Sequence, residues 1–205
     1  MVNAFFGVAA LLLAANALRT AASWKIKPYD ERFYGEGTVY GEAPVGSGNC
    51  AIREPLPSMY DGMIPVALND AQYGNNSEMC GACIKGKGDR GEFKAYVMDR
   101  CPECAHGDLD FAMGGTGRWN INWRFVPCDD GDDPTFIFEG SNAHYWKIQP
   151  RGSKSPVEKL WVNGEKATRT QDNFFVIQGD EPYDGDQEVK TKTFLRKRKK
   201  TQVSL

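Results

Sequence analysis

Alternating apolar and polar residues predict several short β-strands in this chain. Trp119–Val126 alternates strictly over its first part, and residues 93–98 come close to the same pattern. A period of two places one set of side chains on the buried face of a sheet and the other set towards solvent. Shorter apolar runs at 135–138 and 174–177 are typical of further strands.

One β-hairpin and the overall fold class follow from the same pattern. Asn163-Gly164 separates the strand-like segments 157–162 and 165–170, and this dipeptide supplies the two positive φ angles of a type I′ turn. No segment after the N-terminal apolar run sustains a helical period. The chain also contains 22 glycines and 11 prolines, which interrupt long helices. We therefore predict an all-β protein.

The N-terminus has the pattern of a secretory signal. Residues 4–18 are apolar except for Asn16, a length that suits the central region of a signal peptide and is short for a membrane span. Small residues at Thr20, Ala22 and Ser23 offer a cleavage site. We expect a signal peptide at 1–23, a secreted, extracellular protein, and no membrane association after cleavage.

The cysteines allow two interpretations. Four of them form two C-x-x-C pairs, the spacing of a zinc ribbon: Cys80, Cys83, Cys101 and Cys104. Cys50 and Cys128 bring the count to 6, all within 50–128. Because an even, clustered set in a secreted chain usually forms disulfides, we predict disulfides, with no metal and no cofactor.

The positions of the cysteines also suggest that the chain has two domains. Every cysteine lies in a segment at 24–128, and none follows it. Residues 129–134 are acidic and rich in turn formers, as expected of a linker. We predict a second domain at 135–195 and a solvated basic tail at 196–205. The net charge of −2 gives no case for nucleic-acid binding.

An ordered series of short motifs resembles the expansin family. The motifs are Gly-Thr-Val-Tyr-Gly at 37–41, Cys-Gly-Ala-Cys at 80–83, Val-Met-Asp-Arg-Cys-Pro at 97–102, Asp-Leu-Asp-Phe at 108–111, Trp-Arg-Phe-Val-Pro-Cys at 123–128 and Glu-Gly-Ser-Asn at 139–142. Each motif alone is weak, and the order of the series makes it specific. The resemblance implies a six-stranded double-psi β-barrel followed by an immunoglobulin-like β-sandwich that binds cellulose.

The resemblance also implies a disulfide pairing and a set of site residues. The implied disulfides are Cys50–Cys80, Cys83–Cys128 and Cys101–Cys104. Asp110 matches the aspartate that expansins share with the family 45 glycoside hydrolases, where it is the general acid. Thr38, Tyr40 and Asp99 match the polar residues that expansins gather around it. The implied activity is non-hydrolytic loosening of wall glucans by a monomer.

Two alternative functions remain. Inverting hydrolysis needs a second carboxylate about 6.5–9.5 Å from the acid, and Glu42 occupies the position of the hydrolase base, where expansins usually lack an acid. An endo-β-1,4-glucanase with Asp110 as acid and Glu42 as base is therefore one alternative. Because Glu42 lies in a loop rich in Gly and Pro, we expect it to be a solvated surface residue. A barwin-like binding or defence module is the other alternative, which the predicted sandwich disfavours.

The predicted sandwich departs from the aromatic pattern of bacterial expansins. Exposed rings bind polysaccharides by stacking on sugars. The matching positions here are His144, Tyr145 and Asp172, and only Tyr145 is aromatic. Phe174, two residues after Asp172 on the same strand face, is the expected replacement. We predict that Tyr145, His144 and Phe174 contact cellulose or a related wall polysaccharide.

Overall fold

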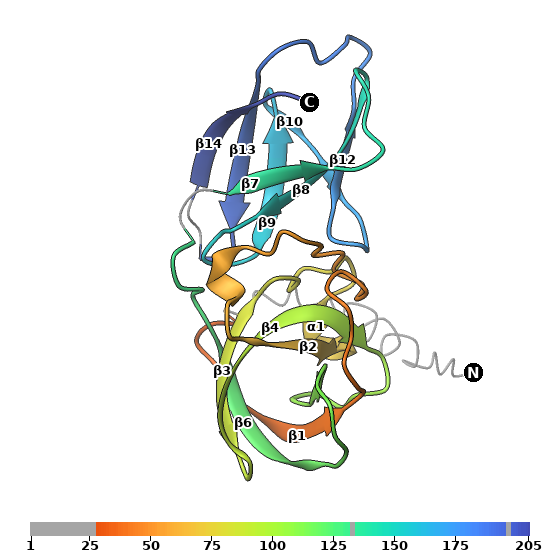
Figure 1. Ribbon diagram of the computed structural model, residues 1–205. Helices are drawn as coiled ribbons and strands as arrows, with labels where there is room; N and C mark the ends of the chain where they lie inside the picture. Colours follow the sequence, from red (N-terminus) through yellow and green to blue (C-terminus); the bar gives the residue numbers. More distant parts are fainter. Residues whose placement is uncertain (1–27, 132–133, 196–197) are drawn as a thin grey trace, which may run out of the picture.

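Six strands of the first half close into a barrel in the computed structural model, which describes residues 28–131, 134–195 and 198–205 (Figure 1). They are hydrogen-bonded in the order β1-β5-β2-β4-β3-β6, with two parallel pairs, β1–β5 and β2–β4. Their bounds are β1 Phe33–Val39, β2 Ile64–Asn69, β3 Cys83–Gly88, β4 Gly91–Cys101, β5 Leu109–Phe111 and β6 Trp119–Val126.

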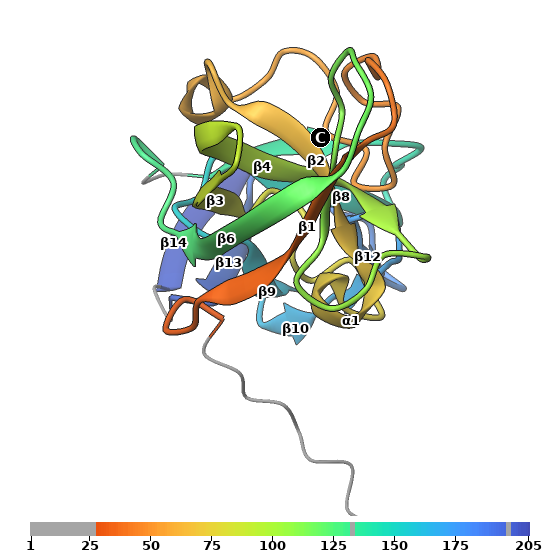
Figure 2. The same cartoon turned by 90° about the horizontal axis from the view of Figure 1, so that it is seen from below.

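The alternating pattern of β6 fills the barrel. Ile121, Trp123 and Phe125 are buried, while Arg124 between them is exposed. The Trp123 Nε1 atom donates to the Gly107 carbonyl oxygen at 2.7 Å, so the polar end of the largest buried ring is satisfied. In the view of Figure 2 the barrel is nearer the viewer than the sandwich, with β1 and β6 in front.

The second half contains two four-stranded antiparallel sheets. One has the order β11-β12-β8-β7 and the other β10-β9-β13-β14. Trp146, Ile148 and Leu160 form the core between them. The bounds are β7 Thr135–Phe138, β8 Tyr145–Arg151, β9 Val157–Val162, β10 Glu165–Lys166, β11 Thr168–Arg169, β12 Phe175–Gln178, β13 Gln187–Thr193 and β14 Arg198–Val203. The predicted all-β fold of barrel plus sandwich is confirmed.

The Asn163-Gly164 turn forms as predicted, but the strand after it is divided. Asn163 has φ 48° and Gly164 φ 88°, the two positive values that a type I′ turn requires. The segment expected as one strand at 165–170 breaks at Ala167, which is buried. The chain thereby leaves one sheet, where β10 pairs with β9, and enters the other, where β11 pairs with β12.

Helical structure is limited to a 3-10 turn at Ser58–Tyr60 and the short helix α1 at Asp70–Tyr73 among the described residues. Asn69 caps α1, because its side-chain oxygen accepts from the Gln72 amide at 3.1 Å. Neither element is long and apolar enough to span a membrane.

The basic C-terminal segment differs from the expected solvated tail at 196–205. Arg198–Val203 forms β14, which pairs with β13 at the edge of a sheet. Its exposed residues alternate with less exposed ones, and Lys200 Nζ lies 2.8 Å from Glu188 Oε2. Lysines on an edge strand disfavour pairing with other chains. The predicted signal peptide at 1–23 and residues 132–133 of the predicted linker lie outside the described residues.

Three disulfides crosslink the first half. They join Cys50 to Cys80, Cys83 to Cys128 and Cys101 to Cys104, the pairing that the resemblance implies. The described chain contains one close group of metal-ligating side chains, Cys101, Cys104 and Asp110. Its two cysteines are bonded to each other, so they offer no thiolates to a metal ion.

Candidate functional site

A row of side chains crosses four adjacent barrel strands. Thr38 on β1 is in register with Asp110 on β5, and Ala67 on β2 is in register with both Asp110 and Asp99, which lies on β4. Residues in register share one face of a sheet. Because neighbouring strands lie about 4.8 Å apart, the backbones at Asp99 and Asp110 are roughly 10 Å apart. Ala67, which lies in register between the two acids, is buried.

A β-bulge places Asp99 in this row. Val66 pairs with Val97, but the next residue, Ala67, pairs with Asp99, so Met98 is the extra residue on β4. Without the bulge Ala67 would oppose Met98, and Asp99 would lie on the other face.

Asp110, Thr38 and Tyr40 form the polar centre of this face of the barrel. We refer to the face formed by these three residues and Asp99 as the groove. Asp110 is half-buried, and its Oδ1 accepts a hydrogen bond from Thr38 Oγ1 at 2.6 Å. Tyr40 follows β1 and is 40% exposed. Burial, followed by the nearby charges of Asp99 and Asp110, raises the pKa of the Tyr40 hydroxyl above its usual range. The hydroxyl therefore stays protonated at neutral pH and can donate to a ligand.

Asp99 holds a loop in place. Its Oδ1 accepts from the backbone amides of Asn49 and Arg100, at 2.7 and 2.8 Å. The Asn49 side chain in turn donates to the Gln171 carbonyl oxygen of the sandwich at 2.7 Å. Asp99 thus contributes both to the acidic row and to the connection between the groove and the second half.

Glu42 lies in the loop that follows β1. It is exposed, and a Cβ atom at Gly114 would lie 3.3 Å from its Oε1, so its carboxylate rests against the loop after β5. In the part of the chain that the structure describes, no hydrogen bond or ion pair holds this carboxylate.

Two of the three predicted sandwich residues are accessible. Tyr145 begins β8 and is half-buried, opposite Gln178 of β12. His144 is exposed, and its Nδ1 lies 3.4 Å from the Gly179 carbonyl oxygen. Trp146 points the other way and is fully buried in the sandwich core.

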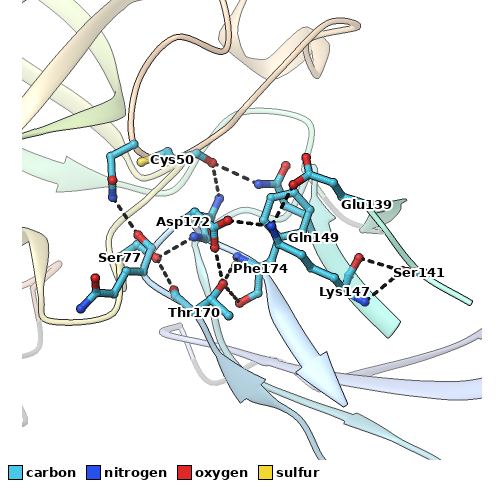
Figure 3. A network of polar contacts seen from close by, with 12 residues as sticks. Cys50, Ser77, Glu139, Ser141, Lys147, Gln149, Thr170, Asp172 and Phe174 are labelled. Carbon is cyan, nitrogen blue, oxygen red and sulfur yellow. Dashed lines mark hydrogen bonds and ion pairs between the residues drawn. The ribbon is translucent and has the colours of Figure 1, made fainter. Parts of the chain in front are cut away.

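Phe174 departs from the expectation that its ring faces a glycan. It is 2% exposed, and Lys147 Nζ covers the ring at 4.4 Å from its centre. The same ammonium group binds Asp172 and Glu139, each at 2.8 Å (Figure 3). Glu139 also pairs with Arg53 of the barrel at 2.7 Å. A charged cluster thus occupies the position where an aromatic ring was expected.

The charges of this cluster stabilise each other. Hydrogen bonds to Asp172 and Glu139 raise the pKa of Lys147, and the bond from Lys147 lowers the pKa of Glu139. All three groups therefore stay ionised at neutral pH. The cluster can offer hydrogen bonds to a ligand but no stacking surface.

Two arginines connect the sandwich to the barrel. Arg169 on β11 donates to the carbonyl oxygens of Asn76 and Ser77, at 2.8 and 2.6 Å, and also bonds Val157 and Asn173. Burial lowers the pKa of its guanidinium to about 10.

Arg151 on β8 makes a second set of contacts with the barrel. It donates to the carbonyl oxygens of Arg53 and Ala51 at 2.7 and 3.3 Å. The sequence offers no signal for either arginine, because an arginine in a short strand usually lies in solvent.

The Cys50 carbonyl oxygen is a further point of contact between the barrel and the sandwich. It accepts from the side-chain amides of Gln149 and Asn173, both at 3.1 Å (Figure 3). Since Cys50 is bonded to Cys80, the same contact anchors two barrel loops to the sandwich. These polar contacts join the two halves, and the bond from Asn49 to Gln171 links Asp99 to the turn that contains Asp172.

A six-stranded mixed barrel that carries an acidic row, joined to two antiparallel sheets, is a fold of the expansin type. The chain belongs to the expansin family. It is 30% identical over 185 residues to Expansin-YoaJ of Bacillus subtilis (strain 168), a match that covers 81% of this chain and 75% of the relative. No protein-family model matches the chain.

The fold is similar to that of the Clavibacter michiganensis expansin. A mutant of that protein in complex with cellohexaose matches with a TM-score of 0.66 and 22% identity, over 84% of this chain and 90% of the other. Its apo structure matches with a TM-score of 0.65 over the same shares.

Proposed function

We propose that this protein is a secreted expansin that binds cellulose-type wall glucans and loosens them without hydrolysis. The observation that carries the proposal is the groove, where Thr38 donates to Asp110 and Tyr40 presents a protonated hydroxyl beside it. Family membership supports the activity, and the cellohexaose complex of the Clavibacter michiganensis expansin supports the ligand class. The three disulfides and the apolar N-terminal run support secretion.

The groove acts by competing for hydroxyl groups. Glucan chains in cellulose hold each other through hydroxyl hydrogen bonds and stacked rings. Asp110 and the Tyr40 hydroxyl supply an acceptor and a donor within one groove, so they can replace hydrogen bonds between chains. No glycosidic bond needs to break, since exchanging these contacts is enough to let chains slide.

The positions of the other carboxylates favour this activity over hydrolysis. The base of an inverting hydrolase must hold a water molecule against the sugar, and small displacements reduce the rate strongly. Asp99 uses one carboxylate oxygen to bind two backbone amides. Glu42 is exposed and has no polar contact that orients it within the described residues. The endoglucanase remains the alternative against which the proposal is tested.

The sandwich adds glycan affinity through Tyr145 and His144. Tyr145 offers part of one ring and His144 an exposed imidazole. Because Asp172 and Lys147 form a charged cluster beside them, the stacking surface is small. We therefore expect weak cellulose binding by this half.

The test compares the wild type with Asp110→Asn and Glu42→Gln. Both changes keep the side-chain shape, and Asp61→Asn, in an exposed turn, is the matched control. Each protein is incubated with cellulose paper, and mechanical weakening is measured together with soluble reducing ends. We expect weakening by the wild type without sugar release, a sharp loss in Asp110→Asn, and little change in Glu42→Gln and Asp61→Asn.

The opposite pattern would establish hydrolysis. Acid and base act as one unit, so either substitution alone would abolish sugar release in a glucanase. Dose-dependent release by the wild type that disappears in Glu42→Gln would therefore replace the proposal with the endoglucanase. A wild type that neither weakens paper nor binds cellulose would exclude both.

A further inference from the structure

An exposed tyrosine lies on the same strand face as the groove. Tyr34, Glu36 and Thr38 alternate along β1, so their side chains share one side of the strand. Tyr34 is 70% exposed, more than any other large hydrophobic residue that the structure describes. Four strand residues place it roughly 13 Å from Thr38. Glu36, held in an ion pair by Arg118, lies between them.

A depression of about 390 Å³ adjoins Tyr34 on the outer surface of β1, β6 and β3. Tyr34 is in register with Asn122 on β6, which is in register with Lys87 on β3, so the three form a row across the depression. These strands are neighbours on the side of the barrel that faces the viewer in Figure 2. A single exposed aromatic residue is common on protein surfaces. A ring beside a polar depression is a more specific arrangement.

The polar residues around the depression offer both donors and acceptors. Asn122 Oδ1 accepts from Arg32 Nη1 at 2.7 Å, which orients the amide and leaves its Nδ2 as a donor. Asp89 Oδ2 accepts from the Asn120 backbone and side chain, at 3.2 and 3.3 Å, and Oδ1 remains as an acceptor. Lys87 forms no ion pair with any described residue. Sugar hydroxyls both donate and accept, so this set matches them.

We propose that this depression is a second glycan-binding site, separate from the groove. Tyr34 stacks on the pyranose ring of a neutral polysaccharide, and Asn122, Lys87 and Asp89 bind its hydroxyls. A neutral sugar fits best because Lys87 and Asp89 carry opposite charges. This inference rests on the proposed function for one point, that the ligand is a wall glycan. Two sites on one protein would strengthen attachment to a polymer by raising the effective concentration at the second site.

The site is tested by NMR titration of the full mature chain, labelled with ¹⁵N, with cellohexaose, mannohexaose and xylohexaose. We expect at least one of them to cause saturable amide shifts at Tyr34, Lys87 and Asn122. Tyr34→Ala should weaken binding at these amides about 3- to 10-fold, whereas Tyr34→Phe should retain it, since the ring is kept. Ile137→Ala, a partly exposed residue of the sandwich, is the control and should change nothing.

Other outcomes overturn the inference. No shift at these amides with any neutral hexasaccharide, or unchanged binding in Tyr34→Ala, removes the second site. Oligogalacturonate is titrated as the charged comparison, and shifts only with this ligand would contradict the neutral ligand class. If Asp110→Asn loses paper weakening but the amide signal of Tyr34 does not shift with any sugar, this site alone is refuted. Shifts at Tyr34 from a wild type that does not weaken paper would refute the proposed function alone.

Discussion

Replacing Arg169 with methionine should loosen the junction between barrel and sandwich. Methionine keeps much of the side-chain length and removes all the guanidinium donors. Four hydrogen bonds are lost, two of them to the barrel carbonyls of Asn76 and Ser77. Ser77 is 1% exposed, so water cannot readily replace the lost donor at that position.

The expected loss follows from these contacts. A hydrogen bond from a charged donor contributes about 1.5–3 kcal/mol, and a buried carbonyl left without a partner costs about 1–3 kcal/mol. The buried cation itself destabilises the folded protein, so removing it offsets part of the stability lost with the hydrogen bonds. The lowered pKa of Arg169, about 10, reflects that cost. We therefore expect a net loss of about 2–4 kcal/mol in the free energy of unfolding, which for a chain of this size lowers Tm by roughly 5–15 °C.

Urea and thermal unfolding, followed by tryptophan fluorescence and circular dichroism, measure the effect. Arg124→Met is the matched control, because Arg124 is exposed on β6 and should change stability by less than about 0.5 kcal/mol. We also expect the two halves of Arg169→Met to unfold in separate transitions. Equal stability of Arg169→Met and the wild type would show that this network does not hold the domains together.

Two further predictions concern tyrosines. Tyr145→Ala should weaken cellulose binding by about 1 kcal/mol in a pull-down isotherm with little change in Tm, whereas a large drop in Tm would identify Tyr145 as a core residue. Burial raises the pKa of Tyr73 to about 12. In the unfolded chain the pKa of this tyrosine is near 10, so between pH 10 and 12 the unfolded chain loses the proton more readily than the folded protein. About 2–3 kcal/mol of the free energy of unfolding should therefore be lost as pH rises from 10 to 12. In Tyr73→Phe the free energy of unfolding, measured by urea, should fall less steeply over this pH range, while absorbance at 295 nm follows tyrosine ionisation. Equal slopes of stability against pH in the variant and the wild type would contradict the raised pKa of Tyr73.

The sequence determined the strands with strong local signals. The alternation in Trp119–Val126 and the Asn163-Gly164 turn depend on neighbouring residues, so the pattern alone predicted β6 and the hairpin. The site residues around Asp110 were expected from the family resemblance, and their role in binding stays a prediction. The family resemblance, rather than spacing, supplied the disulfide pairing.

The tertiary structure decided the features that depend on distant residues. Asp99 joins the groove through a bulge, and bulges leave no sequence pattern that distinguishes them from regular strands. Phe174 lies just before β12 and Asp172 lies in a turn, so the two do not share a strand face as expected, and Phe174 is buried under Lys147. A strand period cannot indicate this burial, because it depends on which side chains pack over the residue. β14 pairs along β13 although its composition suggested a solvated tail, since an edge strand can bury its backbone bonds while its charged side chains stay in water.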